Sequence, residues 1–151
     1  MQITRYTDYS LRVLIYLAVH PNQLCTIQNI ADSYNISKNH LMKIVQELNL
    51  KGYVTAIRGK NGGVTLNKPP SEINIGTLVR MMEHDSKLLE CFSENNHCVI
   101  TPSCRLKGVF MQALESFYQC LDAYHLNDFV NAELSQSLQT LLLINDKQVR
   151  I

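Results

Sequence analysis

The sequence predicts a mainly α-helical protein with one small two-stranded sheet. Three observations support this fold class: apolar residues recur at helical spacing, a glycine-rich segment near residue 60 separates two β-rich runs, and a long apolar stripe follows Pro102. Of the 151 residues, 46% are apolar and 18% are charged. This balance is typical of a packed core with a polar surface and excludes bulk disorder.

Three helices are expected in the first third of the chain. Thr7 and Asp8 cap the first, the second follows Thr26, and the third is capped by Ser37 and closes at Gly52. A helix, a short helix, a tight turn and a longer helix form the plan of a helix-turn-helix. The expected buried face of the third helix consists of Leu41, Ile44, Val45 and Leu48.

A β-hairpin is expected directly after the third helix. Residues 53–57 and 64–66 are β-rich, and an Asn-Gly step lies in the glycine-rich segment 58–63 between them. The expected fold is therefore a winged helix-turn-helix. Two cations and three glycines in this wing let its backbone approach a phosphate chain, which favours nucleic-acid binding over a plain surface turn. The predicted DNA contacts are Ser37, Lys38, Asn39, His40 and Lys43 in the third helix, and Arg58, Lys60 and Asn61 in the wing.

The charge distribution agrees with this interpretation. The net charge is only +1, yet residues 1–80 hold nine Lys or Arg against four Asp or Glu, and residues 81–151 hold five against nine. The N-terminal half can therefore face a polyanion that the C-terminal half repels.

A second helical region follows the wing. Residues 75–83 are expected to be helical, residues 85–100 lose periodicity, and Pro102 opens a long helix whose first turn contains Cys104. Its apolar stripe indicates a dimerisation helix, with packing on its own domain as the alternative, and residues 134–143 form a final amphipathic helix. The expected units are a DNA-binding domain at 1–84, a cysteine loop at 85–104, and a dimerisation helix with tail at 105–151.

Cys91, Cys98 and Cys104 form the one constellation that indicates metal chemistry. Their gaps of six and five residues are wider than those of structural zinc sites, and three widely spaced thiolates suit an iron–sulfur cluster. Such a cluster usually needs a fourth ligand, which the spacing leaves open among His97, His84, Asp8, Glu90 and Glu94. Cys25 and Cys120 stand apart and are expected to be core residues.

The N-terminal residues and apolar runs carry no signal peptide and no membrane span, so a cytoplasmic protein is expected. In that reducing compartment, the five cysteines are not a disulfide framework. No nucleophile–base pair and no phosphate-binding loop is present, so an enzyme is not expected.

Three segments resemble a known family. MQITRYTDYSLR at 1–12, RGKNGG at 58–63 and ITPSCRL at 100–106 are similar to the bacterial winged-helix regulators that carry iron–sulfur clusters, in particular to the branch that senses nitric oxide. The resemblance covers most of the chain and weakens after about residue 135. It implies a homodimer that crosses through the long helix and binds a palindromic double-stranded operator.

The same resemblance implies the ligand set. The cluster, [4Fe–4S] or [2Fe–2S], is held by Cys91, Cys98 and Cys104, with Asp8 of the partner subunit as fourth ligand. In the branch that senses cluster supply, a His three residues after the last cysteine takes that role, and here that position is Lys107. The gap between Cys91 and Cys98 is longer than is usual in the family and leaves the cluster type open.

The resemblance implies a repressor that loses operator affinity when nitric oxide attacks the cluster. A carboxylate is a harder iron ligand than a thiolate, so an Asp-ligated iron is the expected point of attack. If Asp8 bridges the dimer, loss of that bond relaxes the spacing of the recognition helices. Three alternatives stay open: a sibling regulator of cluster supply, redox state or cysteine, an iron–sulfur electron carrier, and a zinc-stabilised binding module.

Overall fold

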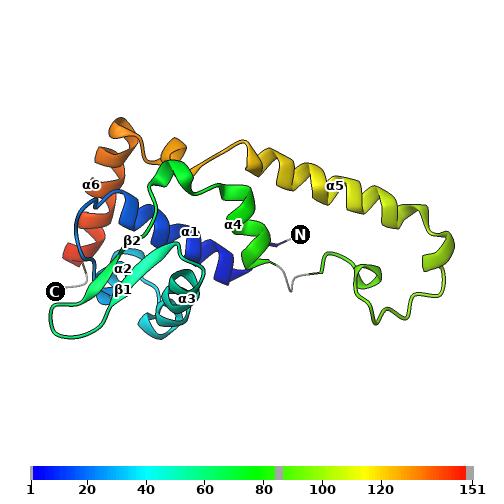
Figure 1. Cartoon of the computed structure of the whole chain (residues 1–151), viewed down its shortest axis with the longest axis horizontal. Coiled ribbons are helices and arrows are strands. Elements are labelled where there is room, and N and C mark those ends of the chain that lie inside the picture. The colour runs from blue at the N-terminus through cyan, green and yellow to red at the C-terminus, as the bar shows by residue number, and fades with distance from the viewer. Residues whose placement is uncertain (1, 84–86, 149–151) are drawn as a thin grey trace.

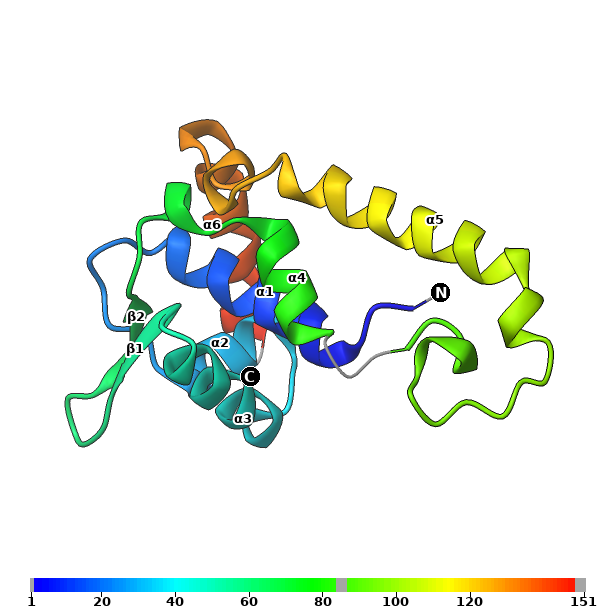
Figure 2. The same ribbon diagram turned by 45° about the vertical axis from the view of Figure 1, so that its right-hand side comes forward.

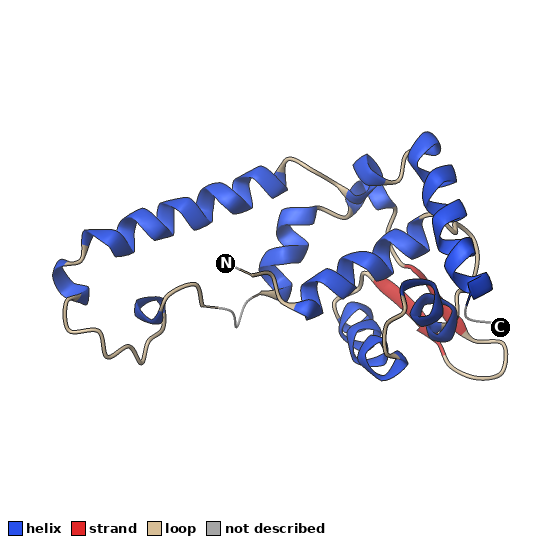
Figure 3. Cartoon of the chain, turned by 180° about the vertical axis from the view of Figure 1, so that it is seen from behind, coloured by secondary structure: helices blue, strands red, loops and turns tan. Residues whose placement is uncertain are grey.

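The structure is a computed structural model that describes residues 2–83 and 87–148 (Figure 1). Within these ranges the fold is mainly helical with one two-stranded antiparallel sheet (Figure 3), which confirms the predicted fold class. The predicted boundary at 84/85 lies outside the described residues. The elements are α1 (Arg5–Ala18), α2 (Ile27–Tyr34), α3 (Lys38–Leu50), β1 (Val54–Ile57), β2 (Gly63–Leu66), α4 (Ile75–Met82), α5 (Arg105–Asp122) and α6 (Ala132–Gln148).

Helix α1 begins before the predicted cap. Thr4 occupies the N-cap, and its hydroxyl oxygen accepts a hydrogen bond from the backbone N–H of Thr7. The cap predicted at Thr7 and Asp8 is therefore wrong, because both residues lie inside the helix. Thr7 is fully buried and donates its hydroxyl proton to Glu83, whereas Asp8 lies half-exposed in the first turn.

The hydrophobic core lies where α1 packs on α3 and the wing. Val13, Leu14, Leu41 and Ile44 are fully buried in it. The predicted buried face of α3 is confirmed, since Leu41, Ile44, Val45 and Leu48 are all buried. Leu126 and Leu142 join the same core, and α6 packs on α2, so the last part of the chain returns to the winged helix (Figure 1).

The wing is a hairpin, as predicted. Its outermost pair joins Ile57 to Gly63, so the loop comprises residues 58–62. The left-handed backbone conformation occurs at Gly59, with φ of 108°, and the N–H of Gly62 donates to the Gly59 carbonyl at 3.0 Å. A Cβ on Gly62 would lie 2.1 Å from the Ile57 carbonyl oxygen, so the tip requires glycine there.

The long helix projects away from the core (Figures 1 and 2). Pro102 lies in a short 3-10 turn, Thr101–Ser103, and Cys104 takes an extended conformation as the N-cap of α5. The predictions that Pro102 opens the α-helix and that Cys104 lies in its first turn are therefore wrong. No residue of α5 is buried in the single chain, although the helix has 18 residues. No described helix is both long enough and apolar enough to span a bilayer.

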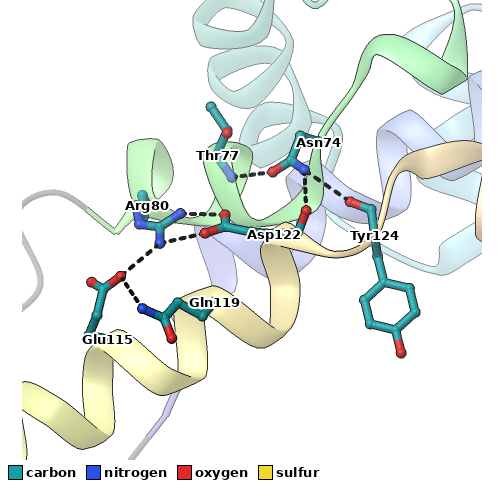
Figure 4. Close-up of polar contacts among 7 residues, drawn as sticks. All are labelled: Asn74, Thr77, Arg80, Glu115, Gln119, Asp122 and Tyr124. Atoms are coloured by element: carbon teal, nitrogen blue, oxygen red, sulfur yellow. Dashed lines mark hydrogen bonds and ion pairs between the residues drawn. The ribbon is translucent and has the colours of Figure 1, made fainter.

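Among the described residues, the C-terminal half of α5 is anchored on α4 (Figure 4). The Arg80 guanidinium donates two hydrogen bonds to the Asp122 carboxylate and lies 4.6 Å from the Tyr118 ring centroid. The Asn74 side chain donates to the Asp122 carbonyl at 2.7 Å. A Cβ on Gly76 would lie 2.0 Å from an Asp122 oxygen, so the two helices meet at a glycine.

Candidate nucleic-acid interface and cysteine loop

A groove of about 880 Å³ runs between α3, the start of α2 and the wing. Apart from Val45, the α3 residues that line it lie off the buried face of the helix, so the folding pattern of α3 itself aims them outward. Lys38, Asn39, Lys43 and Arg58, four of the predicted DNA contacts, line it. The structure thus brings the first turns of α3 and one arm of the wing onto one surface.

The other four predicted contacts do not line this groove. Ser37, Lys60 and Asn61 are exposed beside it, at the start of α3 and at the wing tip. The ring of His40, which is also exposed, lies edge-on to Tyr9 of α1 with 5.9 Å between ring centroids.

Sequence reasoning missed several groove residues. Gln28 of α2, Met42 and Gln46 of α3, and Ile57 of β1 line the groove, and Met42 and Ile57 are about half exposed there. Along α3, the groove positions 39, 42, 43 and 46 alternate with the buried positions 41, 44, 45 and 48. The helical period of α3 therefore contained the signal.

The cations of this surface are available to an external anion. None of Lys38, Lys43, Arg58 and Lys60 forms an ion pair within the described part of the chain. Hydrogen bonds from two places in the chain hold the wing beside them. The Asn49 side-chain oxygen accepts from the Ala56 N–H at 3.0 Å, and Cys25 exchanges two backbone hydrogen bonds with Val64.

The three cysteines of the predicted cluster lie on one exposed segment. Cys91 is half-buried in a short 3-10 turn, Cys98 is exposed, and Cys104 is half-buried at the N-cap of α5. Hydrogen bonds hold the segment to itself: the His97 N–H donates to a Glu90 carboxylate oxygen at 2.9 Å, and the Thr101 hydroxyl donates to the Cys98 carbonyl at 2.8 Å. No hydrophobic residue from 87 to 116 belongs to the described core or packs against it.

The single chain does not assemble a metal site from its described residues. Within 2–83 and 87–148, no three His, Cys, Asp or Glu side chains are grouped closely enough to hold a metal ion. His84, one of the open fourth-ligand candidates, lies outside the described residues. Cys25 is buried behind the wing, and burial raises the pKa of its thiol, whereas Cys120 is exposed rather than in the core.

The donor set nevertheless fits an iron–sulfur cluster. All three thiols are free, and thiolate sulfur is the ligand that such clusters use. Cys104 also begins an 18-residue helix and makes no side-chain capping bond, so its sulfur lies where free N–H groups favour negative charge. This open segment is compatible with a site that forms only when a cluster and a second chain are bound.

Asp8 lies on α1 rather than on the cysteine segment. Its carboxylate accepts two hydrogen bonds from Arg12, at 2.8 and 3.1 Å, and its side chain is 44% exposed. Arg12 in turn lies over the rings of Tyr9 and Tyr34. Asp8 is therefore reachable from solvent and connected through Arg12 to α2.

Comparison with known proteins identifies the family. The model of the Rrf2 family, described as an iron-dependent transcriptional regulator, matches residues 3–132. The chain is 54% identical to the HTH-type transcriptional regulator NsrR of Bacillus licheniformis, over 86% of this chain and 92% of that protein. The NsrR regulator of Bacillus subtilis is 52% identical over 86% and 90%. The chain belongs to the Rrf2 family.

Solved structures agree with this assignment to the Rrf2 family. The oxidized form of Staphylococcus aureus CymR matches 87% of this chain and 97% of its own, with 25% identity and a TM-score of 0.68. T. potens IscR, at 22% identity, shares the fold with a TM-score of 0.69 over 86% of each chain. This Rrf2 protein is thus a winged-helix transcriptional regulator, and the family resemblance of the three sequence segments is confirmed.

Proposed function

We propose that this Rrf2 regulator is a homodimeric repressor that binds a palindromic operator and releases it in response to nitric oxide. One joint observation carries the proposal. A chain 54% identical to an NsrR regulator has a groove lined by unpaired cations and, at the start of a projecting helix, a segment with three free thiols. A DNA-reading surface and a sensor segment in one chain are the parts that a regulated repressor needs.

The groove residues support DNA binding through two kinds of contact. Asn39, Lys43 and Gln46 can reach base edges if α3 enters the major groove, because amides and cations there match purine acceptors and donors. Arg58 and Lys60 lie on the wing, where they can neutralise phosphates or enter the minor groove. A palindrome requires two such surfaces about 34–36 Å apart, and therefore a dimer.

The exposed apolar face of α5 supports that dimer. Leu106, Val109 and Met111 are each more than half exposed, and Phe110 is 40% exposed. A helix that leaves such side chains in water gains stability when a second copy covers them. We therefore assign residues 105–122 to dimerisation, with 87–104 as the sensor segment and the winged helix as the DNA-binding unit.

The cluster ligands in this proposal are Cys91, Cys98 and Cys104 of one chain and Asp8 of the partner subunit. When bound, the cluster supplies irons that nitric oxide can ligate. The half-exposed Asp8 carboxylate must leave Arg12 or share it in order to bind iron, and Arg12 contacts Tyr34 of α2. Lys107, three residues after Cys104, carries a cationic side chain in place of an imidazole, which favours Asp8 as the fourth donor.

Anaerobic purification tests this function. The absorption spectrum, iron and sulfide contents are measured first, and an operator is recovered from a random-sequence DNA library with the coloured protein. Nitric oxide is then added while operator binding is followed. We expect iron and sulfide in the purified protein and an affinity loss of about 5–150-fold. Colourless protein with bound zinc, or coloured protein without DNA affinity, would instead support the binding module or the electron carrier.

A further inference from the structure

A buried polar cluster joins the start of α1 to the end of α4. Glu83 is only 6% exposed, and one of its carboxylate oxygens accepts hydrogen bonds from the Thr4 N–H at 2.9 Å, from the Thr4 hydroxyl at 2.7 Å and from the Thr7 hydroxyl. Thr7 is fully buried. The bonds connect residues 76 and 79 positions apart, so they fix two distant segments to one another.

Stability alone gives a weak reason for a carboxylate at this position. Burying an acidic group costs free energy that its hydrogen bonds only offset, and well-packed apolar residues of similar volume often replace such groups at no cost. The position of the cluster offers a stronger reason. Thr7 directly precedes Asp8, and Glu83 lies eight positions before Cys91, the first of the three cysteines.

A third element meets Glu83 at the same place. A cavity of about 190 Å³ is lined by Glu83, by Lys87 at the root of the cysteine segment, and by Leu114 and Tyr118 of α5. The pKa of Tyr118 is raised, first by its burial and then by the negative charge of Glu83, as expected for a carboxylate that faces α5. The start of α1, the root of the cysteine segment and the middle of α5 therefore converge on one side chain.

We propose that Glu83 is a positioning residue that couples the cysteine segment to the DNA-binding helices. Its hydrogen bonds to Thr4 and Thr7 tie the first turn of α1 to the end of α4, beside the cavity that Lys87 also lines, and α1 packs directly on α3, the proposed recognition helix. A rearrangement of the segment therefore moves α1 and changes the placement of α3. This inference rests on the proposed cluster-dependent repressor.

Thr7→Val tests the coupling because valine has nearly the same shape and removes only the hydroxyl. Thr7→Ser retains the hydroxyl, and Thr77→Val on the exposed side of α4 is the matched control. For each protein, the operator Kd is measured with and without the cluster, on DNA selected from a random-sequence library. Iron content, sulfide content and absorption spectrum are recorded in parallel. Glu83→Gln, which keeps the size of the side chain, gives an independent variant if Thr7→Val does not fold.

The operator Kd without the cluster, divided by the Kd with it, is expected to be about 5–150 in the wild type. It should stay in this range in Thr7→Ser and Thr77→Val. In Thr7→Val and Glu83→Gln it should fall to about threefold or less, while the spectrum and iron content stay at wild-type values. If the wild type shows a ratio of about 5–150 and Thr7→Val and Glu83→Gln show ratios within about twofold of it, the coupling role is wrong and the proposed function stands. Loss of the cluster in the variants would also overturn it, whereas a wild-type ratio near one would refute the proposed function itself.

Discussion

In the winged helix, the groove residues project from elements whose other faces are buried. The wing is fixed beside α3 by a hydrogen bond that the Asn49 side chain accepts and by two that Cys25 exchanges with Val64. Residues 87–104, in contrast, bond mainly to themselves, and their three thiols are not grouped into a metal site within the described chain. The first region is built by the chain alone. The second contains the thiols of the proposed cluster site, which the described part of the single chain does not assemble.

The long helix α5 favours a second copy of the chain as the partner of this segment. Its C-terminal end is tied to α4 by Arg80 and Asp122, and its N-terminal end leads away from the core with apolar side chains exposed. In the proposed dimer, a second copy of the chain covers this face and supplies its own Asp8 to the cysteine segment. The proposed DNA-binding surface therefore needs only the fold of one chain, whereas the proposed sensor also needs a cluster and a second chain. Mutations can affect one without the other.

The largest expected effect is loss of the cluster while the structure of the groove is unchanged. Cys98→Ala removes one predicted cluster ligand at an exposed position, so the protein should be colourless and the cluster-dependent part of operator affinity, about 5–150-fold, should vanish. The control, Cys120→Ala, also removes an exposed thiol and should keep the chromophore. Full iron and sulfide content in Cys98→Ala would contradict the ligand assignment.

A second substitution tests the ligand proposed to come from the partner subunit. Asp8→Asn removes the anionic ligand and keeps the shape, and because Thr4 is the cap of α1, helix stability should change little. We expect an altered spectrum, a less stable cluster and operator binding weakened by about 1–3 kcal/mol. Asp32→Asn is the matched control, since Asp32 also bonds a side chain one helical turn away. Identical spectra and affinities for Asp8→Asn and wild type would exclude Asp8 as a ligand.

On the DNA side, Lys60→Ala should weaken binding to all sequences alike. It removes one exposed cation at the wing tip, so the slope of log affinity against log salt should fall by about one. The spectrum of the cluster should not change. Lys51→Ala, at the far end of α3, is the control with an unaltered slope. A change of base preference with the slope intact would show that the wing reads bases rather than phosphates.

The smallest expected effect concerns the joint between the two regions. The Arg80 guanidinium, mainly through its hydrogen bond, holds the pKa of the Asp122 carboxyl below its ordinary value. A lowered pKa in the folded state means that the ion pair stabilises the protein at neutral pH, and that this contribution is lost as the pH falls below about 4.

Asp122→Asn should therefore lower the Tm slightly at pH 7, because exposed ion pairs contribute little, and the difference from wild type should fade toward pH 3. Thermal unfolding at several pH values measures it, with Glu133→Gln as an exposed control. A difference that persists unchanged at pH 3 would show that charge at Asp122 is not what joins α4 to α5.

Local signals were enough to predict most of the winged helix from the sequence. Thr26 caps α2, Asn35 ends it in a left-handed conformation, and the period of α3 identifies its buried face. The start of α1 was predicted wrongly because Thr4 and Thr7 are both good caps. In the fold, Glu83 accepts hydrogen bonds from both hydroxyls across 76 and 79 positions, and such long-range contacts leave no local signal.

The cysteine segment was predictable in composition and not in arrangement. Residue type and spacing select Cys91, Cys98 and Cys104, whereas local sequence does not describe the cluster and the second chain that the proposed site requires. Pro102 illustrates the same limit at the start of α5, because its fixed φ suits both a 3-10 turn and an α-helix. In the groove, Gln28 and Gln46 lie outside the two segments to which the sequence assigned DNA contacts, the first turns of the third helix and the wing, and the fold brings them there.

Mixed dimers test most directly that the sensor is completed across two chains. One chain carries Asp8→Asn with its cysteines intact, and the other keeps Asp8 but has Cys91, Cys98 and Cys104 changed to Ala. Two different affinity tags isolate the heterodimer, whose spectrum and nitric oxide reactivity are compared with those of both parent homodimers. Because the intact cysteines face the intact Asp8 of the partner subunit, we predict one cluster per dimer with the wild-type spectrum. A spectrum identical to that of the Asp8→Asn homodimer would contradict the account.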